Sequence, residues 1–285
     1  MKTVSGEIFE GERALYRAEG LTLRSCTFQN GESPLKHSSG ITAESTVFDW
    51  KYPIWYSRDI TVINCEFSTN ARAGIWYSGN IRVAGSRLDA PKLFRRCSGV
   101  SITDSRFTDA KETLWDCSDV RLRSVHVRGD YFGMNCRNVE AEDLTIDGNY
   151  AFDGAENVQL SDSKLICKDA FWNCKNVEVS RSFISGEYLG WNSEDLTFTD
   201  CTIESLQGLC FVKNLVLRNC RLPGTTLAFE LSSVDADIIG RVPGIKNPAR
   251  GRIRAGSIGE LILDPAEVDV FATEVTTSER RTVFP

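Results

Sequence analysis

A repeat of about 20 residues runs through most of the 285-residue chain and constrains its fold more than any other feature. The segments that begin Asn138-Val-Glu-Ala, Asn157-Val-Gln-Leu and Asn176-Val-Glu-Val can be laid over one another. Eleven segments of 19 to 21 residues share this register, and they start at Gly20, Gly40, Asp59, Asn80, Gly99, Asp119, Asn138, Asn157, Asn176, Asp195 and Asn214. A fixed period of this length predicts a solenoid.

Within each segment, apolar residues alternate with polar ones, as in strands that bury one face. We therefore predict that the interior side chains Val158, Leu160, Ser163, Leu165 and Cys174 stack under Val177, Val179, Ser182, Ile184 and Ser193. Only parallel coils stack identical positions in this way, and parallel crossovers are right-handed. The Asn, Asp and Gly at each start suit a left-handed corner, where Asn138, Asn157 and Asn176 are expected to form a ladder on the inside.

The predicted fold is all-β: a single right-handed parallel β-helix solenoid of about eleven coils, with caps at both ends. Residues 1–19 are expected to form an N-terminal cap or partial coil, and residues 20–232 the β-helix. The register fades after about Ser232, so residues 233–285 are predicted to form a C-terminal cap that ends in a tail from Thr276 to Arg281. Polar caps protect the open sheet edges of a solenoid.

Composition narrows the function classes. The net charge of −6 comes without a basic stripe, so no nucleic-acid partner is expected. No apolar run is long enough to span a bilayer, and none at the start is typical of a signal peptide. The ten cysteines alternate with Ser and Ala in the repeat columns, which indicates reduced packing residues and a cytoplasmic location. No metal site and no cofactor are predicted.

An aromatic column in the last third of each coil is the first candidate site. It contains the predicted substrate-binding residues Trp55, Trp76, Arg95, Trp115, Trp172 and Trp191, with Met134 and Asp153 at the same position. Because Arg95 and Asp153 would be poorly placed in an apolar core, we expect the column to face outward. Rings beside Asn, Asp and Arg suit sugars, which stack and hydrogen-bond together. The alternative is that the tryptophans point inward and fill the coil.

A charged line lies just before that column. It is basic toward the N-terminus, at Lys51, Arg72 and Lys92, which are further candidate substrate-binding residues. It becomes acidic at the candidate catalytic residues Glu112, Asp130, Asp169 and Glu187. Carboxylates on adjacent coils would lie roughly 5 Å apart, near the separation in a retaining glycosidase, with Glu112 or Asp169 as the general acid at a raised pKa. The alternative is a solvated ladder in which Lys92 and Glu112 pair.

Two functions remain open. The first is a carbohydrate-binding or carbohydrate-processing protein and, if it is an enzyme, a polysaccharide hydrolase or lyase. The second is a non-enzymatic scaffold that binds another protein. The uniform coil length argues against a walled catalytic groove, because enzymes on such scaffolds usually enclose the substrate with long loops. The sequence does not predict the oligomeric state.

The strings Trp50-Lys-Tyr-Pro-Ile-Trp-Tyr, Arg72-Ala-Gly-Ile-Trp-Tyr and Lys168-Asp-Ala-Phe-Trp-Asn-Cys resemble an uncharacterised bacterial family of unknown function. The repeat as a whole is similar to the right-handed β-helix superfamily that includes pectate lyases. These resemblances imply a fold and no particular reaction. The Cys65-Glu-Phe and Ser105-Arg-Phe strings also resemble one side of pentapeptide-repeat coils, which leaves a triangular or a four-sided coil open.

Overall fold

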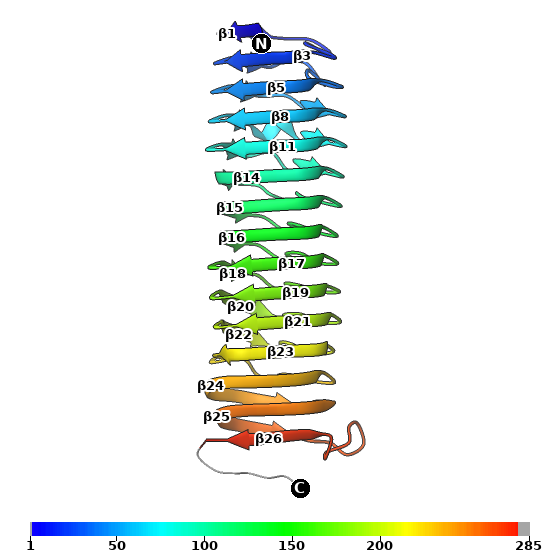
Figure 1. Ribbon diagram of the computed structural model, residues 1–285, viewed down its shortest axis with the longest axis vertical. Coiled ribbons are helices and arrows are strands. Elements are labelled where there is room, and N and C mark those ends of the chain that lie inside the picture. Colours follow the sequence, from blue (N-terminus) through cyan, green and yellow to red (C-terminus); the bar gives the residue numbers. More distant parts are fainter. Residues whose placement is uncertain (1, 279–285) are drawn as a thin grey trace. The chain divides into compact units, whose positions relative to one another are not determined.

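The computed structural model describes residues 2–278, and the chain divides into two compact units, residues 1–148 and 149–285. Both units are built from stacked parallel strands that wind in a right-handed sense (Figure 1). Of the predicted tail, Thr276 and Thr277 belong to a strand, whereas residues 279–281 lie outside the described part of the chain. The all-β parallel solenoid predicted from the repeat is therefore confirmed.

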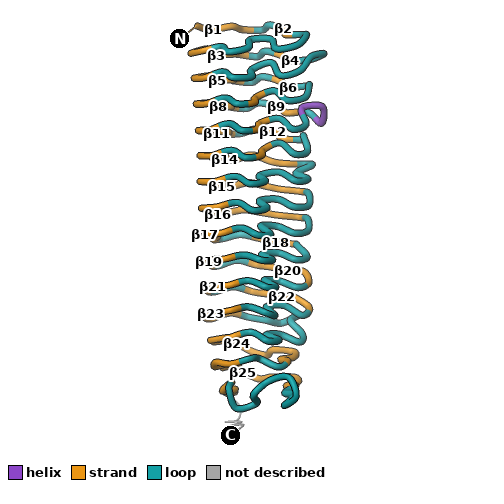
Figure 2. The backbone as a smooth tube through the Cα atoms, turned by 90° about the vertical axis from the view of Figure 1, so that its right-hand side faces the viewer, coloured by secondary structure: helices purple, strands orange, loops and turns teal. Residues whose placement is uncertain are grey.

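In the first unit, each coil begins with a long strand; the first five coils continue through a separate short strand, whereas in the last three the long strand extends over that position (Figure 2). The long strands are β1 (Lys2–Ser5), β3 (Glu19–Arg24), β5 (Ser39–Glu44), β8 (Arg58–Ile63), β11 (Gly79–Ala84), β14 (Ser98–Phe107), β15 (Ser118–Arg128) and β16 (Arg137–Asp147). The short strands are β2 (Ile8–Phe9), β4 (Thr27–Phe28), β6 (Val47–Phe48), β9 (Glu66–Phe67) and β12 (Arg87–Leu88). A separate small sheet contains β7 (Ile54–Trp55), β10 (Ile75–Trp76) and β13 (Phe94–Arg95). One 3₁₀ helix, η1 (Thr69–Ala71), interrupts a turn.

The second unit repeats this plan. Its long strands are β17 (Glu156–Ser161), β19 (Lys175–Ser180), β21 (Glu194–Thr199), β23 (Lys213–Cys220), β24 (Ser233–Lys246), β25 (Arg250–Ile262) and β26 (Thr273–Thr277). Its short strands are β18 (Lys164–Ile166), β20 (Phe183–Glu187) and β22 (Thr202–Leu206). None of the helices in the described chain is long and apolar enough to cross a membrane.

The core consists of the predicted columns. Val158 pairs with Val177, and Leu160 pairs with Val179, across β17 and β19. Leu165 pairs with Ile184 on the next side of the coil. The Ser182 hydroxyl accepts the Ser163 backbone N–H at 3.0 Å, so even the small polar column is satisfied inside the coil. Because identical positions stack in successive coils, the buried residues of this region could be predicted from the repeat alone.

The corner prediction is correct in conformation and wrong in position. Asn138, Asn157 and Asn176 all have positive φ, near 56°, which Asn tolerates better than most residues. Their side chains are exposed, however, so this ladder lies on the outside of the coil. The Asn176 Nδ2 group donates to Asn157 Oδ1 at 2.8 Å. Apolar side chains fill the interior and leave the amides in water.

The predicted count of eleven coils is too low, because the described residues form about fifteen turns. At the N-terminus, β1 already pairs with β3 as a coil of its own. At the C-terminus, β24, β25 and β26 continue the stacking in parallel. They escaped detection because bulges near Ile238 and Arg241, and an offset of 17 residues from Ser233 to Arg250, break the 19-residue spacing.

Candidate functional site: the turn face

The turns that link each short strand to the next long strand stack into four columns, which we call the turn face. Backbone hydrogen bonds fix their register: Tyr56 donates to the Trp76 carbonyl, and Glu112 to the Asp130 carbonyl. In the first unit, the third column is Tyr16, Lys36, Trp55, Trp76, Arg95, Trp115 and Met134, and the fourth is Arg17, His37, Tyr56, Tyr77, Arg96, Asp116 and Asn135. The candidate site residues lie on this face.

The tryptophans of the third column are half-buried and stack on one another. The rings of Trp55 and Trp76 lie 5.2 Å apart with an interplanar angle of 5°. Their indole N–H groups donate to carbonyls of the following turn, Trp55 to Ala73 at 2.6 Å and Trp76 to Lys92 at 2.8 Å. The column therefore lies on the outside of the coil, as predicted, but its ring faces are covered by neighbouring side chains.

Arg95 occupies the gap between two tryptophans. Its guanidinium carbon lies 4.8 Å from the ring centres of both Trp76 and Trp115. One terminal nitrogen pairs with Glu112 at 3.1 Å, while the Nε atom is buried without a hydrogen-bond partner in the described structure. A cation between two ring faces is attracted to both. Arg95 thus continues the ring stack rather than reaching into solvent.

The fourth column carries the most accessible rings. Tyr56 and Tyr77 are 44 % and 37 % exposed, and their rings stack at 4.9 Å with an interplanar angle of 6°. The His37 ring stacks on Tyr56 at 5.2 Å. We call these three rings together with Trp55 and Trp76 the aromatic patch.

Cations close the aromatic patch at both ends. The ammonium group of Lys36 lies 5.7 Å from the Trp55 ring centre and 5.6 Å from that of Tyr56. At the other end, Arg96 lies 5.9 Å from the Tyr77 ring centre and 3.5 Å from the Asp116 carboxylate. Within residues 2–278, no carboxylate pairs with Lys36. The patch is therefore a flat surface of ring edges with positive charge at its margins.

The charged line predicted from the sequence occupies two columns rather than one. Lys51, Arg72, Asp130 and Glu187 belong to the first column, whereas Lys92, Glu112 and Asp169 belong to the second. Glu112 consequently stacks against Tyr131, and Asp169 against Tyr188, so each proposed carboxylate pair is diagonal. Lys51 pairs with Glu32 at 3.1 Å, and Lys92 pairs with Glu112 at 3.0 Å, as the alternative interpretation of a solvated ladder expected.

The electrostatics of Glu112 do not suit a general acid. Partial burial raises the pKa of Glu112, but hydrogen bonds and charges from Lys92 and Arg95 outweigh it and hold the pKa below its ordinary value. A carboxyl group with a lowered pKa carries no proton to donate near neutral pH. This finding runs against the prediction of a raised pKa at this position.

Asp169 has the opposite environment. It is only 7 % exposed, and burial is the main reason why its pKa is raised. Nearby Glu187 and Asp153 raise the pKa further, while a Tyr150 hydrogen bond and the Lys168 charge oppose the shift. Glu187 itself pairs with Lys168 at 3.0 Å. The direction of the pKa shift at Asp169 is thus the one expected of a general acid, in contrast to Glu112.

The turn face of the second unit has fewer exposed rings. Trp172 and Trp191 stack at 5.9 Å, and Phe211 meets Trp191 edge-on at 5.1 Å. Their indole N–H groups donate to the carbonyls of Tyr188 and Gln207. In the fourth column, Gly154, Asn173 and Asn192 replace the rings of the first unit. The Asn192 amide donates to Asn173 Oδ1 at 2.8 Å, which forms an exposed amide ladder.

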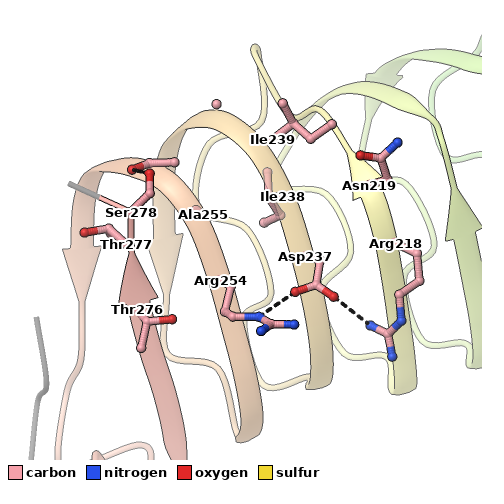
Figure 3. Close-up of a pocket in the computed structure, with 12 residues that line it drawn as sticks. Arg218, Asn219, Asp237, Ile238, Ile239, Arg254, Ala255, Thr276, Thr277 and Ser278 are labelled. Atoms are coloured by element: carbon pink, nitrogen blue, oxygen red, sulfur yellow. Dashed lines mark hydrogen bonds and ion pairs between the residues drawn. The ribbon is translucent and has the colours of Figure 1, made fainter. Parts of the chain in front are cut away.

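A hollow of about 710 Å³, which the repeat did not predict, lies on β23 to β26 (Figure 3). Asp237 bridges two arginines there, at 2.6 Å from Arg254 and 3.8 Å from Arg218. The floor contains Ile238 and Ala255, and the bulge beside Ile238 opens the surface. The hollow falls in the region where the 19-residue spacing breaks down, so periodicity carried no signal for it.

A smaller hollow of about 280 Å³ lies on the long strands of the first unit. Gly99 and Ser101 form its base because their side chains are small, and Arg82 and Arg121 line its sides. Arg121 pairs with Glu140 at 3.0 Å. The residues come from one exposed strand face, so this is a shallow depression between long side chains.

The cysteines lie inside the coils. All ten are buried and unpaired with one another in disulfides. Burial raises the pKa of the Cys210 thiol to about 12, which leaves it protonated at neutral pH and weakly nucleophilic. Within the described residues, no three His, Cys, Asp or Glu side chains converge to hold a metal ion.

The chain is similar to several solved structures, at low sequence identity and with low TM-scores. A surface adhesin of Streptococcus pneumoniae, PfbA, is 12 % identical with a TM-score of 0.35, covering 96 % of this chain and 80 % of that one. HetL, a pentapeptide repeat protein from the cyanobacterium Nostoc, is 12 % identical with a TM-score of 0.34, covering 82 % and 86 %. The A-module of the Azotobacter vinelandii mannuronan C-5 epimerase AlgE4 is 10 % identical with a TM-score of 0.30, covering 97 % and 91 %.

No curated protein matches the chain. One family model does match, and it spans residues 2–276, which include every coil of both units and the whole turn face. The match agrees with the resemblance of the tryptophan-containing turn strings to a bacterial family of unknown function. The chain therefore belongs to the family described as "Protein of unknown function (DUF3737)".

Proposed function

We propose that the protein is a non-enzymatic scaffold that binds another protein through the aromatic patch. The observation that carries this proposal is the backbone of the fourth column. His37, Tyr56 and Tyr77 have φ values of 60°, 55° and 56°, a left-handed conformation that bulky side chains rarely adopt. Asn173 and Asn192 take the same conformation in the second unit with the residue type that suits it, whereas Phe211 and Leu231, which follow them in the column, are bulky again.

The aromatic residues therefore work against local backbone preference. A side chain that conflicts with its backbone position, and gains little burial there, is expected where function selects it. Tyr56 and Tyr77 remain exposed, so filling the core does not explain them. Their neighbours Lys36 and Arg96 add charge at the margins. Tyr, Trp and Arg are the residue types most enriched at the energetic centres of protein interfaces.

The geometry favours a protein over a sugar as the ligand of this patch. Sugars gain affinity from aromatic rings by stacking on an open ring face. Here Trp55 and Trp76 cover each other, and Tyr56 lies between His37 and Tyr77. The surface thus presents ring edges, which carry partial positive charge. Short, uniform turns also leave the face flat, as protein interfaces commonly are.

The test compares a patch variant with a matched control. Tyr56→Asn/Tyr77→Asn removes two rings while placing a favoured residue at each left-handed position. Thr42→Asn/Thr61→Asn makes the same number of changes on the long strands. Affinity capture from cells of the source, quantified by mass spectrometry, should recover a protein with wild type and control that the patch variant loses by at least about tenfold. Equal recovery with all three chains would refute the proposal.

A second candidate, glycan binding or cleavage at the second unit, is favoured by one observation. Asp169 is buried with a raised pKa, Glu187 on the next coil pairs with Lys168 at 3.0 Å, and Trp172 and Trp191 are on the same face. Glycoside hydrolysis uses two carboxyl groups, one of which donates a proton and therefore needs a raised pKa. Binding and hydrolysis assays on a panel of neutral and acidic polysaccharides, with Asp169→Asn and Trp172→Ala, test it. Binding or turnover unaffected by both substitutions would exclude this site.

The buried thiols support a proposal for the cellular compartment. Ten buried cysteines without a disulfide support a reducing compartment, so we propose a cytoplasmic location. Fractionation of source cells with an antibody to the protein tests this, and recovery in the extracellular fraction would contradict it.

A further inference from the structure

The turn faces of the two units carry opposite charge. In the first unit, the four columns contain nine cations and five acidic residues. The cations are Arg13, Arg17, Lys36, Lys51, Arg72, Lys92, Arg95, Arg96 and Lys111, and the acidic residues are Glu12, Glu32, Glu112, Asp116 and Asp130. In the second unit, the same columns contain the acidic residues Asp153, Asp169, Glu187 and Glu230 and the single cation Lys168. Asp169 is buried and Glu230 pairs with Lys246 of β24 at 2.6 Å, so Asp153 and Glu187 are the carboxylates that this face presents to a partner.

The acidic face also exposes apolar side chains. Leu206 is 49 % exposed and follows Glu187 in the first column, with which it pairs in register. Phe211 and Leu231, 38 % and 41 % exposed, follow Asn192 in the fourth column. Isolated apolar residues on a surface need no explanation, but here three lie on stacked turns beside carboxylates. This face offers apolar and acidic groups, which complement ring edges and cations.

We infer, on the basis of the protein-binding function proposed above, that the partner is a second copy of this chain. The aromatic patch and its marginal cations on one copy dock against the acidic, apolar turn face formed by residues 149–231 of another copy. Opposite charges orient the encounter, and the exposed rings and apolar side chains supply the surface removed from water. Contacts between two first-unit faces are disfavoured, because each carries more cations than acidic residues.

Two positively charged residues of the first unit are well placed to test the inference. Lys36 and Arg72 lie on the basic turn face, and neither pairs with a carboxylate within the described chain. Reversing their charge therefore breaks no ion pair in the protein itself. On the acidic face, Asp153 accepts a surface hydrogen bond from Asn173, and Glu187 pairs with exposed Lys168, so their substitution leaves the core intact.

Sedimentation velocity on the full chain, from about 1 to about 100 μM, should show a weight-average sedimentation coefficient that rises with concentration. The association should weaken at least about tenfold between roughly 0.05 M and 0.5 M salt, because exposed charges are screened. Lys36→Glu/Arg72→Glu and Asp153→Lys/Glu187→Lys should each weaken it by a similar factor. The control Arg82→Glu/Arg106→Glu, with the same charge change on the long strands, should associate like wild type.

Mixing the two turn-face variants provides the decisive measurement. Each variant alone keeps only one unchanged turn face, whereas the mixture brings together the unchanged basic face of Asp153→Lys/Glu187→Lys and the unchanged acidic face of Lys36→Glu/Arg72→Glu. We expect the mixed sample to associate more strongly than either variant alone. A wild-type chain that stays monomeric at every concentration and salt overturns the inference, as does a mixture that behaves like the sum of its components. Circular dichroism of each variant verifies that the fold is retained.

The result also separates this inference from the function on which it rests. If the chain is monomeric but the aromatic patch still captures another protein, the scaffold function holds and the second copy is excluded as the partner. If neither self-association nor patch-dependent capture is observed, the proposed protein-binding function itself is wrong.

Discussion

The fourth column of the turn face adopts the same backbone conformation in both units but contains different residues. In the second unit it begins with Gly154, Asn173 and Asn192, the types that a left-handed position prefers, and continues with the bulky residues Phe211 and Leu231. In the first unit it holds His37, Tyr56, Tyr77 and Arg96 at similar positive φ values, before Asp116 and Asn135. The left-handed conformation is thus required by the coil, and the choice of side chain is not. Each unit departs from the backbone preference over part of its column, and the first unit does so with stacked rings.

The second column also places residues of one type in different environments in the two units. Glu112 and Asp169 are both carboxyl groups at the start of a turn, yet the pKa of Glu112 is lowered and that of Asp169 is raised. The difference lies in the neighbours, because Lys92 and Arg95 reach Glu112 while burial dominates at Asp169. A position in a repeat therefore specifies where a side chain lies, and the adjacent coils determine its chemistry.

The largest expected loss of stability comes from substitutions in the cores, and it should be similar in the two units. Leu122→Asp in the first unit and Leu160→Asp in the second each place an unpaired charge between apolar layers, at a cost of about 3–5 kcal/mol. Hydrogen exchange should show lost protection first in the coils adjacent to each substitution, because coils contact only their neighbours. A soluble Leu160→Asp chain with unchanged protection in residues 156–199 would contradict the register.

The stacking of Arg95 between two rings should contribute less to the free energy of unfolding than a core leucine does. Arg95→Ala removes two cation–ring contacts and one ion pair, and we expect a loss of about 2 kcal/mol in the free energy of unfolding. Lys92→Ala, which removes only an exposed pairing with Glu112, should cost under about 1 kcal/mol. Urea denaturation of both variants checks this order. Equal losses would mean that the rings contribute nothing to holding Arg95.

The two carboxyl groups should shift stability in opposite directions with pH. Because the pKa of Glu112 is lowered in the fold, its charge contributes stability above the pKa of the unfolded chain, and this is lost as pH falls through the folded-state pKa. Glu112→Gln should therefore destabilise by about 1 kcal/mol at pH 7 and by little in acid.

For Asp169 the sign is reversed. Its raised pKa means that the folded chain holds the proton more tightly, so its contribution is most favourable in acid and is lost as pH rises through that pKa. Asp169→Asn should stabilise the protein at pH 7, and the gain should vanish at low pH. Thermal unfolding of both variants between pH 3 and 8 measures this. Parallel pH profiles for Glu112→Gln and Asp169→Asn would refute the contrast.

The smallest expected effect comes from exchanging residues between the two fourth columns. Asn173→Tyr should destabilise by about 0.5–1 kcal/mol, because it brings a bulky residue to a left-handed position and removes two amide hydrogen bonds. Tyr77→Asn should change stability by less than about 0.5 kcal/mol, since relief of strain offsets the lost ring stack. If Tyr77→Asn is strongly destabilising, the ring is structural and the argument for a binding patch weakens.

The sequence predicted the core and the backbone conformation of the corners well, because alternation and left-handed preference act locally and repeat, but it placed the Asn ladder on the wrong side of the coil. Val158, Leu160 and Leu165 are where the pattern placed them. The turn columns were predicted less well, because coils of 19 to 21 residues absorb their length differences there, which moved Lys92 and Glu112 one column away from Lys51 and Arg72. The stacking of Arg95 between rings depends on side-chain direction, which periodicity does not contain.

The corner at Asn157 and the corner at Asn176 are separated by one coil of 19 residues, and each side chain's closest chemical neighbours belong to the coil above or below. Loss of a single residue within a strand would move the side chains after it to the opposite face and turn buried ones outward. Removal or duplication of one whole coil would leave all columns aligned. Inherited length changes in relatives of this chain should therefore fall in the turns or occur in steps of one coil, and surface charges such as Arg121 and Glu140 should change in pairs that lie one step apart.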